Sequence, residues 1–167
     1  MIDFVVSKVA MMMAAVFILL AGIGIYEIQK SAMEEEELQN IADKISETVN
    51  ELSAINANTE VNISFDRYRG GIYIKPTVGD VYKINITRNL LFITQKGRRI
   101  ASNFINAIHV WKPDKGEYSG SEIADLDDEN RYMNINSRDD VVIFVERKQI
   151  EVMGLQEYHT FVYSSFP

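Results

Sequence analysis

An uninterrupted apolar segment near the amino terminus limits what this chain can fold into. From Val9 to Tyr26 there are 18 residues without a charge, and no proline occurs between Asp3 and Leu52. The pattern predicts one continuous helix of about 50 residues, which would be roughly 75 Å long at about 1.5 Å per residue. The hydrocarbon core of a bilayer is only about 30 Å thick, so about half of this helix has to lie outside any membrane.

The rest of the chain is long enough for one globular domain. Of the 167 residues, about 110 remain after the helix, which suffices for a compact domain with its own core. We expect residues 1–55 to form the helix, with an apolar segment at 4–26 and an amphipathic extension at 27–53. Residues 58–167 are expected to form the head domain.

The extension of the helix carries a narrow apolar stripe. Its members recur at steps of three and four residues: Leu38, Ile41, Ile45, Val49 and Leu52. Such a stripe has to be covered, either by the head of the same chain or by a second chain in a coiled coil, although it spans fewer than three heptads. The four glutamates at 34–37 predict a solvated face where burial ends.

Charge and composition exclude some classes of function. The net charge is −7, and −6 of it lies in residues 31–57, so the head with 15 acidic and 14 basic residues is almost neutral. No basic face is left to follow a phosphate backbone, and we expect no nucleic-acid partner. The chain has no cysteine, which excludes disulfides and thiolate metal sites and leaves stability to packing.

From residue 60 onward the apolar period changes to two. Val81–Thr87 alternates clearly, and Asn89–Gln95 follows after a short turn, which predicts a hairpin. We expect further strands at Val61–Phe65, Gly71–Lys75, Phe104–Trp111, Val141–Arg147, Gln149–Met153 and Tyr158–Tyr163. Short strands with turn signals at this spacing suggest an antiparallel sandwich or barrel of immunoglobulin size. We therefore predict an α+β protein, a long hydrophobic helix followed by an immunoglobulin-like β-sandwich head.

The sequence offers little catalytic chemistry. His109 and His159 are the only histidines, and each falls in a strand pattern, where a packed or surface histidine is commoner than a ligand. The acidic stretch Glu122–Glu129 lacks the central glycine and trailing glutamate of a calcium loop, so we expect a solvated loop. We expect no enzymatic activity, no metal site and no cofactor.

Two asparagines match the acceptor pattern for N-glycosylation. They are Asn62 in Asn-Ile-Ser and Asn85 in Asn-Ile-Thr. Both lie in the head, and Asn85 belongs to the outward-facing set of its strand. We regard both as candidate modification sites.

The apolar segment itself has three interpretations: a cleaved secretory signal, a membrane anchor, or a helix buried among copies of itself in a fibre. Asp3 and Lys8 stand at its start, five positions and about 140° apart, so they cannot readily face each other within one helix. If the segment is buried, each charge needs a partner from a neighbouring copy. At a membrane surface, water would solvate both charges. Small residues and methionines would let helices pack closely.

The start Met1-Ile2-Asp3-Phe4-Val5, the long apolar helix, its charged continuation and a cysteine-free β-rich head resemble archaeal type IV pilin-like subunits, the group that includes the archaeal flagellins. In that family the helices bundle into the filament core and the heads form the shell. The resemblance implies that the chain forms a homopolymeric extracellular filament. Before assembly it would be inserted in the cytoplasmic membrane, and pilus assembly machinery would be a partner. The assembly helix would use Ile2, Asp3, Phe4, Val5, Lys8, Val9, Met12, Val16, Phe17, Leu20 and Ile23.

A second architecture would give nearly the same sequence. A single-pass, membrane-anchored accessory or stator protein of a pilus or archaellum system would present a similar β-rich head outside the membrane as a binding module. The two alternatives differ in whether lipid or identical copies finally cover the apolar helix.

Overall fold

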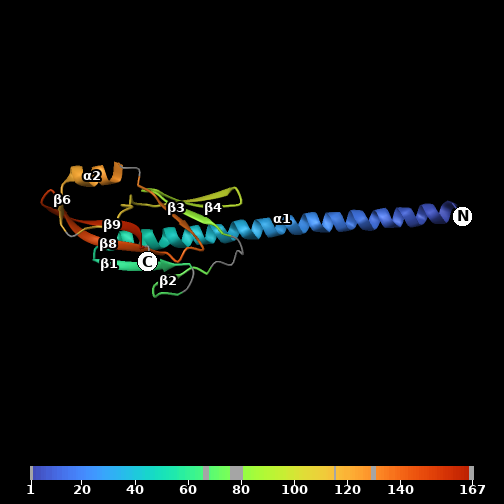
Figure 1. The fold of residues 1–167 in the computed structure, drawn as a ribbon, viewed down its shortest axis with the longest axis horizontal. Coiled ribbons are helices and arrows are strands. Elements are labelled where there is room, and N and C mark those ends of the chain that lie inside the picture. Colours follow the sequence, from blue (N-terminus) through green and yellow to red (C-terminus); the bar gives the residue numbers. More distant parts are fainter. Residues whose placement is uncertain (1, 66–67, 76–80, 115, 129–130, 166–167) are drawn as a thin grey trace. The chain divides into compact units, whose positions relative to one another are not determined.

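The computed structural model describes residues 2–65, 68–75, 81–114, 116–128 and 131–165, with the backbone alone described at 2–5 and 165. In chain order the elements in Figure 1 are α1 (Ile2–Ala54), β1 (Thr59–Ser64), β2 (Ile72–Tyr73), β3 (Lys83–Ile86), β4 (Leu90–Gln95), β5 (Arg98–Asn103), β6 (Glu117–Tyr118), α2 (Gly120–Asp128), β7 (Met133–Asn136), β8 (Val142–Val152) and β9 (Leu155–Ser165). This confirms an α+β fold with a long apolar helix before a β-rich region.

The chain divides into two compact units, Met1–Glu37 and Leu38–Pro167. The boundary falls inside α1, whereas the sequence pattern predicted a boundary at the end of the helix, between residues 55 and 58. In the first unit, none of residues 6–37 is buried. Five consecutive residues, Val16 to Leu20, are between 54% and 72% exposed. Because consecutive residues of a helix point about 100° apart, this part of α1 is apolar on every side.

In the second unit, the last part of α1 is a core element. The apolar stripe is buried with Ala42 added to it: Leu38, Ile41, Ala42, Ile45, Val49 and Leu52. These side chains share one core with residues of both sheets, such as Ile63 and Ile84. Figure 1 draws this part of α1 between the β3–β4 strands and the β8–β1 strands. Of the two predicted covers for the stripe, the head of the same chain is therefore the one observed.

The strands form two sheets. In the first, β8 pairs antiparallel with β1 along Val142–Arg147 and with β9 along its full length, while β2 pairs with β1 and β6 with the end of β8, both parallel. Since a strand has two edges, β1 and β6 share one edge of β8 and β9 occupies the other. The second sheet is antiparallel in the order β5-β4-β3-β7.

Two tight hairpins have the backbone that their sequences favour. Lys96 and Gly97 between β4 and β5 have φ of 49° and 81°, and Met153 and Gly154 between β8 and β9 have φ of 52° and 83°. Two successive positive φ values are typical of the two-residue turn that matches the twist of antiparallel strands, and glycine adopts them without steric cost. The predicted hairpin of β3 and β4 is also confirmed.

Some local predictions were wrong. The range Phe104–Trp111 holds a single bridge, between His109 and Phe161. Other amides of this range bond elsewhere: Phe104 N donates to Asn89 O and Ile108 N to Arg88 O, both in the β3–β4 turn, and Ile105 N donates to Asn50 Oδ1 of α1. The two strands predicted at Val141–Arg147 and Gln149–Met153 are the one strand β8. The strands β5, β6 and β7 were not predicted, since they are short or polar and depend on pairing with neighbours.

The loop predicted at Glu122–Glu129 was also wrong over its described residues, because Gly120–Asp128 is the helix α2. A capping box starts it: Glu122 N donates to Ser119 Oγ at 3.1 Å, and Ser119 N donates to Glu122 Oε2 at 2.6 Å. The bond from the Ser119 backbone amide, with that from its hydroxyl, lowers the pKa of Glu122. The acidic residues therefore begin and line a helix.

Candidate functional site

The helix α2 packs on the face of the first sheet that is turned away from α1. Trp111, Ile150 and Phe161 form a second buried cluster there, and Ile123 and Leu126 of α2 pack against it. Phe161 and Val162 are adjacent on β9, and Val162 belongs to the main core. Side chains alternate between the two faces of a strand. One face of β9 therefore packs in the main core, and the other packs in the cluster beneath α2.

His109 is placed beside β9 by its own backbone. His109 N donates to Thr160 O at 2.9 Å, and Val162 N donates to His109 O at 2.8 Å. The side chain then stands on the α2 side of the sheet, where its ring centroid is 5.3 Å from that of Trp111 and 5.1 Å from that of Phe161. An isolated pair of backbone bonds thus brings residue 109 next to residues 159 and 161.

Asp127, near the end of α2, accepts the hydrogen bonds of the neighbouring His109 and Trp111 side chains, and its own side chain is only 3% exposed. His109 Nδ1 lies 2.9 Å from Oδ1 and 3.1 Å from Oδ2, and Trp111 Nε1 donates to Oδ1 at 3.0 Å. Arg88 Nη1 approaches Oδ2 at 3.5 Å. A buried carboxylate requires such partners, because an unpaired buried charge is strongly unfavourable.

These contacts assign one proton position in the two histidine rings. His109 Nδ1 faces a carboxylate, so it carries a proton and donates it to Asp127. His159 Nδ1 lies 2.8 Å from His109 Nε2, so one of these two nitrogens donates a hydrogen bond to the other. We call Asp127, His109, His159 and Glu157 the carboxylate–histidine cluster.

The second ring nitrogen of His159, Nε2, faces Glu157. His159 Nε2 is 3.3 Å from Glu157 Oε2, yet this buried nitrogen makes no hydrogen bond to a described residue. The separation is that of an ion pair, but a bond would form only if Nε2 were protonated and turned toward Glu157. Burial of the ring, followed by the nearby His109, lowers the pKa of His159, and Glu157 only partly opposes this. We therefore assign the neutral form at pH 7.

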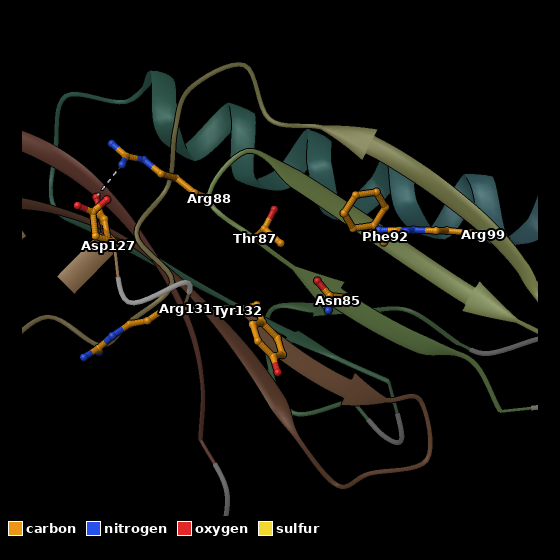
Figure 2. A pocket seen from close by; sticks show the side chains of 9 residues that line it. Asn85, Thr87, Arg88, Phe92, Arg99, Asp127, Arg131 and Tyr132 are labelled. Carbon is orange, nitrogen blue, oxygen red and sulfur yellow. Dashed lines mark ion pairs between the residues drawn. The ribbon is translucent and has the colours of Figure 1, made fainter. Parts of the chain in front are cut away.

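Beside this cluster lies an open pocket of about 480 Å³. It is lined by Asn85, Thr87, Arg88, Phe92, Arg99, Asp127, Asp128, Arg131 and Tyr132, and we call it the arginine pocket (Figure 2). The residues come from β3, β4, β5, the β3–β4 turn, the end of α2 and the segment before β7. Its volume falls within the range of small-molecule sites.

Two arginines of the arginine pocket have defined contacts. Figure 2 shows Arg88 reaching toward Asp127 and Arg99 lying against the ring of Phe92. The guanidinium carbon of Arg99 is 3.7 Å from the Phe92 ring centroid, a cation–π contact that orients the planar group. Tyr132 is 61% exposed and offers an aromatic face to the same space.

The two candidate glycosylation sites have different surroundings. Asn85 lines the arginine pocket, and its Nδ2 donates to Asn134 Oδ1 at 2.7 Å. Asn62 lies in β1 between two paired strands, and its Oδ1 is buried without a hydrogen bond to a described residue. Of the two, Asn85 is the better placed for a bulky modification, which stays a prediction.

The residues predicted for assembly lie in the first unit. Ile2, Asp3, Phe4 and Val5 belong to α1, and their side chains are outside the described residues. The others are all exposed: Lys8, Val9, Met12, Val16, Phe17, Leu20 and Ile23. The segment from Val6 is long and apolar enough to cross a membrane, and its most apolar 18-residue window is 0% buried.

Sequence reasoning missed Asp127, Trp111 and the arginine pocket. The capping sequence Ser119-x-x-Glu122, followed by Ile123 and Leu126 three residues apart, was a usable signal for α2. No comparable signal pairs His109 with His159, because fifty residues separate them. Among the described residues, no three histidine or carboxylate side chains are grouped so as to hold a metal ion.

The fold and these sites define a class: an α+β protein whose apolar amino-terminal helix is long enough to cross a membrane and whose β-rich head carries a polar pocket. No protein-family model, curated protein or solved structure matches the chain. Functional inference therefore depends on three features of the chain itself: the exposed apolar helix, the carboxylate–histidine cluster and the arginine pocket.

Proposed function

We propose that this protein is the structural subunit of an extracellular type IV pilus-like filament. Copies would polymerise through the first part of α1, with the β-rich heads outside. The observation that carries the proposal is the apolar surface of that helix: 15 large apolar side chains between Val6 and Met33 are 51% to 72% exposed. A soluble monomer rarely exposes an apolar surface of this extent, so an external partner has to cover it.

Energetics favour a partner that surrounds the helix. Each large apolar side chain removed from water contributes about 1.5–3 kcal/mol, and these side chains point in all directions around α1. One neighbour covers only one side of a helix and leaves the opposite side in water. A bundle of like helices covers every side, as does lipid before assembly.

Small residues within the segment support close packing between helices. Gly22 and Gly24 have nothing within 4 Å of the position a Cβ would occupy, so a neighbouring backbone can approach there. Ala14, Ala15 and Ala21 add further small surface. Without a hydrophobic gain over lipid, close van der Waals packing of this kind is what draws apolar helices together.

We further propose that the head is an immunoglobulin-like sandwich adapted to hold a helix. In support, residues of both sheets share one core, among them Val145 of the first sheet and Ile93 of the second. The buried part of α1 from Leu38 to Leu52 enters the same core, which an ordinary two-sheet sandwich does not require. The head would leave the cytoplasmic side with the helix still in the membrane, and assembly machinery would then transfer the subunit to the filament.

The alternative function is a single-pass, membrane-anchored accessory or binding module. The arginine pocket favours it, because a concave polar site suits a head that binds a ligand more directly than one that only packs against its neighbours. In this case lipid covers α1 permanently, and the protein is present in few copies.

Electron microscopy and mass spectrometry of material sheared from the native cell surface test the filament directly. We expect the chain to be the main component of a fibre. Asp3→Ala should reduce assembly or alter subunit register while the head unfolds at the same temperature as before, because the charge would lose its partner on a neighbouring copy. Glu27→Ala, which removes an exposed acid farther along the same helix, serves as the control.

Two results would count against the filament. One is recovery of the chain only as single molecules in the membrane fraction, with no polymer. The other is normal filament yield and symmetry from Asp3→Ala, which would remove the role assigned to that residue.

A further inference from the structure

We propose that the arginine pocket binds an acidic saccharide, meaning a sugar unit that carries a carboxylate. This role goes beyond the filament proposal, since it concerns the head and is the same whether lipid or other copies cover α1. Four kinds of group line the arginine pocket: guanidinium, aromatic ring, side-chain amide or hydroxyl, and one exposed carboxylate. A carboxylated sugar is a ligand that uses all four.

The charges of the arginine pocket favour an anion. Among the described lining residues, Arg88, Arg99 and Arg131 are basic and Asp127 and Asp128 are acidic, in a chain whose net charge is −7. The carboxylate of Asp127 already accepts hydrogen bonds from His109 and Trp111, and its side chain is only 3% exposed. A ligand in the open part of the pocket therefore meets the exposed guanidinium groups of Arg88 and Arg99 rather than the buried carboxylate of Asp127.

Two guanidinium groups are available in a set geometry. Arg88 is 53% exposed, and its 3.5 Å contact with Asp127 is an ion pair longer than a hydrogen bond. Arg99 is exposed, and its planar group is oriented by the Phe92 ring 3.7 Å away. A planar guanidinium binds a carboxylate through two parallel N–H donors, and one that is already oriented loses less freedom on binding.

The remaining lining groups distinguish a sugar from a bare anion. Tyr132 presents a ring that is 61% exposed, which suits the apolar C–H face of a pyranose. Thr87 and the amide of Asn85 line the same space and can exchange hydrogen bonds with ring hydroxyls, and the exposed Asp128 can accept from them. Inorganic phosphate would engage the arginines but would leave the ring and Asp128 unused.

Calorimetry with the full-length chain in detergent tests the proposal. The protein is produced without N-glycosylation, so that no glycan on Asn85 can fill the pocket. The probes are a tetramer of galacturonic acid, its methyl ester, which keeps the sugar and removes the charge, and inorganic phosphate. We expect saturable binding of the acid, with the ester and phosphate each at least about tenfold weaker, as the loss of a charge-assisted hydrogen bond implies.

Substitutions locate the binding. Arg88→Gln, Arg99→Gln and Tyr132→Ala should each weaken binding of the acid about tenfold, and a single cooperative melting transition well above the assay temperature shows that each variant is folded. Arg138→Gln is the matched control, since this exposed arginine lies in the β7–β8 turn outside the pocket. Its affinity should equal that of the unaltered chain.

Four results would overturn the proposal. These are no saturable binding of the tetramer, equal binding of its ester, equal binding of phosphate, or the same loss of affinity in Arg138→Gln as in Arg88→Gln. The last would mean that the anion responds to overall charge and not to this pocket.

Discussion

Removing the buried carboxylate of Asp127 should destabilise the head more than any other single change in α2. In Asp127→Ala, His109 Nδ1 and Trp111 Nε1 lose the acceptor that they contact at 2.9 Å and 3.0 Å. Both rings belong to residues that are less than 8% exposed. Neither donor can therefore turn to bulk water without moving α2 away from the sheet.

The magnitude follows from the cost of leaving these two donors unsatisfied. Each buried donor without a partner costs about 1–3 kcal/mol, so the loss of the acceptor for both donors in Asp127→Ala should lower the free energy of unfolding by about 2–6 kcal/mol. A domain of ordinary stability has about 5–15 kcal/mol in total. For a unit of this size, a loss of about 3 kcal/mol lowers the melting temperature by roughly 10 °C.

Asp127→Asn provides a graded comparison. The closest contacts of His109 and Trp111 both end on Oδ1, which the asparagine amide oxygen can replace. The loss should then be smaller, about 1–2 kcal/mol, because the bonds weaken when the acceptor is no longer charged. Asp125→Ala, an exposed acid in the same helix, is the control and should change stability by less than about 0.5 kcal/mol.

The measurement is urea denaturation of the full-length protein in detergent, followed by circular dichroism and by fluorescence. The chain has one tryptophan, and it is Trp111 of this cluster, so its emission reports the site itself. A loss in Asp127→Ala no larger than that in Asp125→Ala would refute the structural role assigned to the carboxylate. Equal losses in the alanine and asparagine variants would refute the assignment of Oδ1 as the shared acceptor.

Three further predictions concern the head. Because burial lowers the pKa of His159, the unfolded chain binds this proton at a higher pH than the folded chain; stability should be full above about pH 6.5 and fall below it, and His159→Asn should flatten that slope in melting curves. Ile45→Ala should cost about 2–5 kcal/mol in urea denaturation, since the side chain is 0% exposed, and a loss below 1 kcal/mol would contradict a core position. Gly154→Ala should cost about 1 kcal/mol from its φ of 83° alone, because nothing lies within 4 Å of the added Cβ; Gly116→Ala, equally open and without a positive φ, should be neutral in the same assay.

Local patterns were sufficient to predict the helix and several of the strands. The helix α1 follows from an apolar run without proline, and its stripe from Leu38 to Leu52 follows from three- and four-residue spacing. The β3–β4 hairpin follows from alternation on both sides of a short turn. Each of these signals lies within one stretch of chain, so no knowledge of distant residues was needed.

Short polar strands could not be predicted in the same way. β5 reads Arg-Arg-Ile-Ala-Ser-Asn and β7 reads Met-Asn-Ile-Asn, and neither has a run of strand-forming residues. They are strands because β4 and β3 offer them unpaired backbone groups in register. Strand preference depends strongly on the neighbours to which a segment is paired, and these neighbours are distant in sequence.

By itself, the sequence determined the long apolar helix, the neutral head without cysteine, and the β3–β4 hairpin, because each depends on residue type or on spacing within a few turns of chain. Only the tertiary structure decided that residues 109, 127 and 159 meet, and that Arg88, Arg99 and Arg131 surround one pocket. Their positions depend on the bridge of His109 to β9, on the register of β4 with β5 and on the docking of α2. Register and docking are set by many weak contacts between distant segments, which no local pattern encodes.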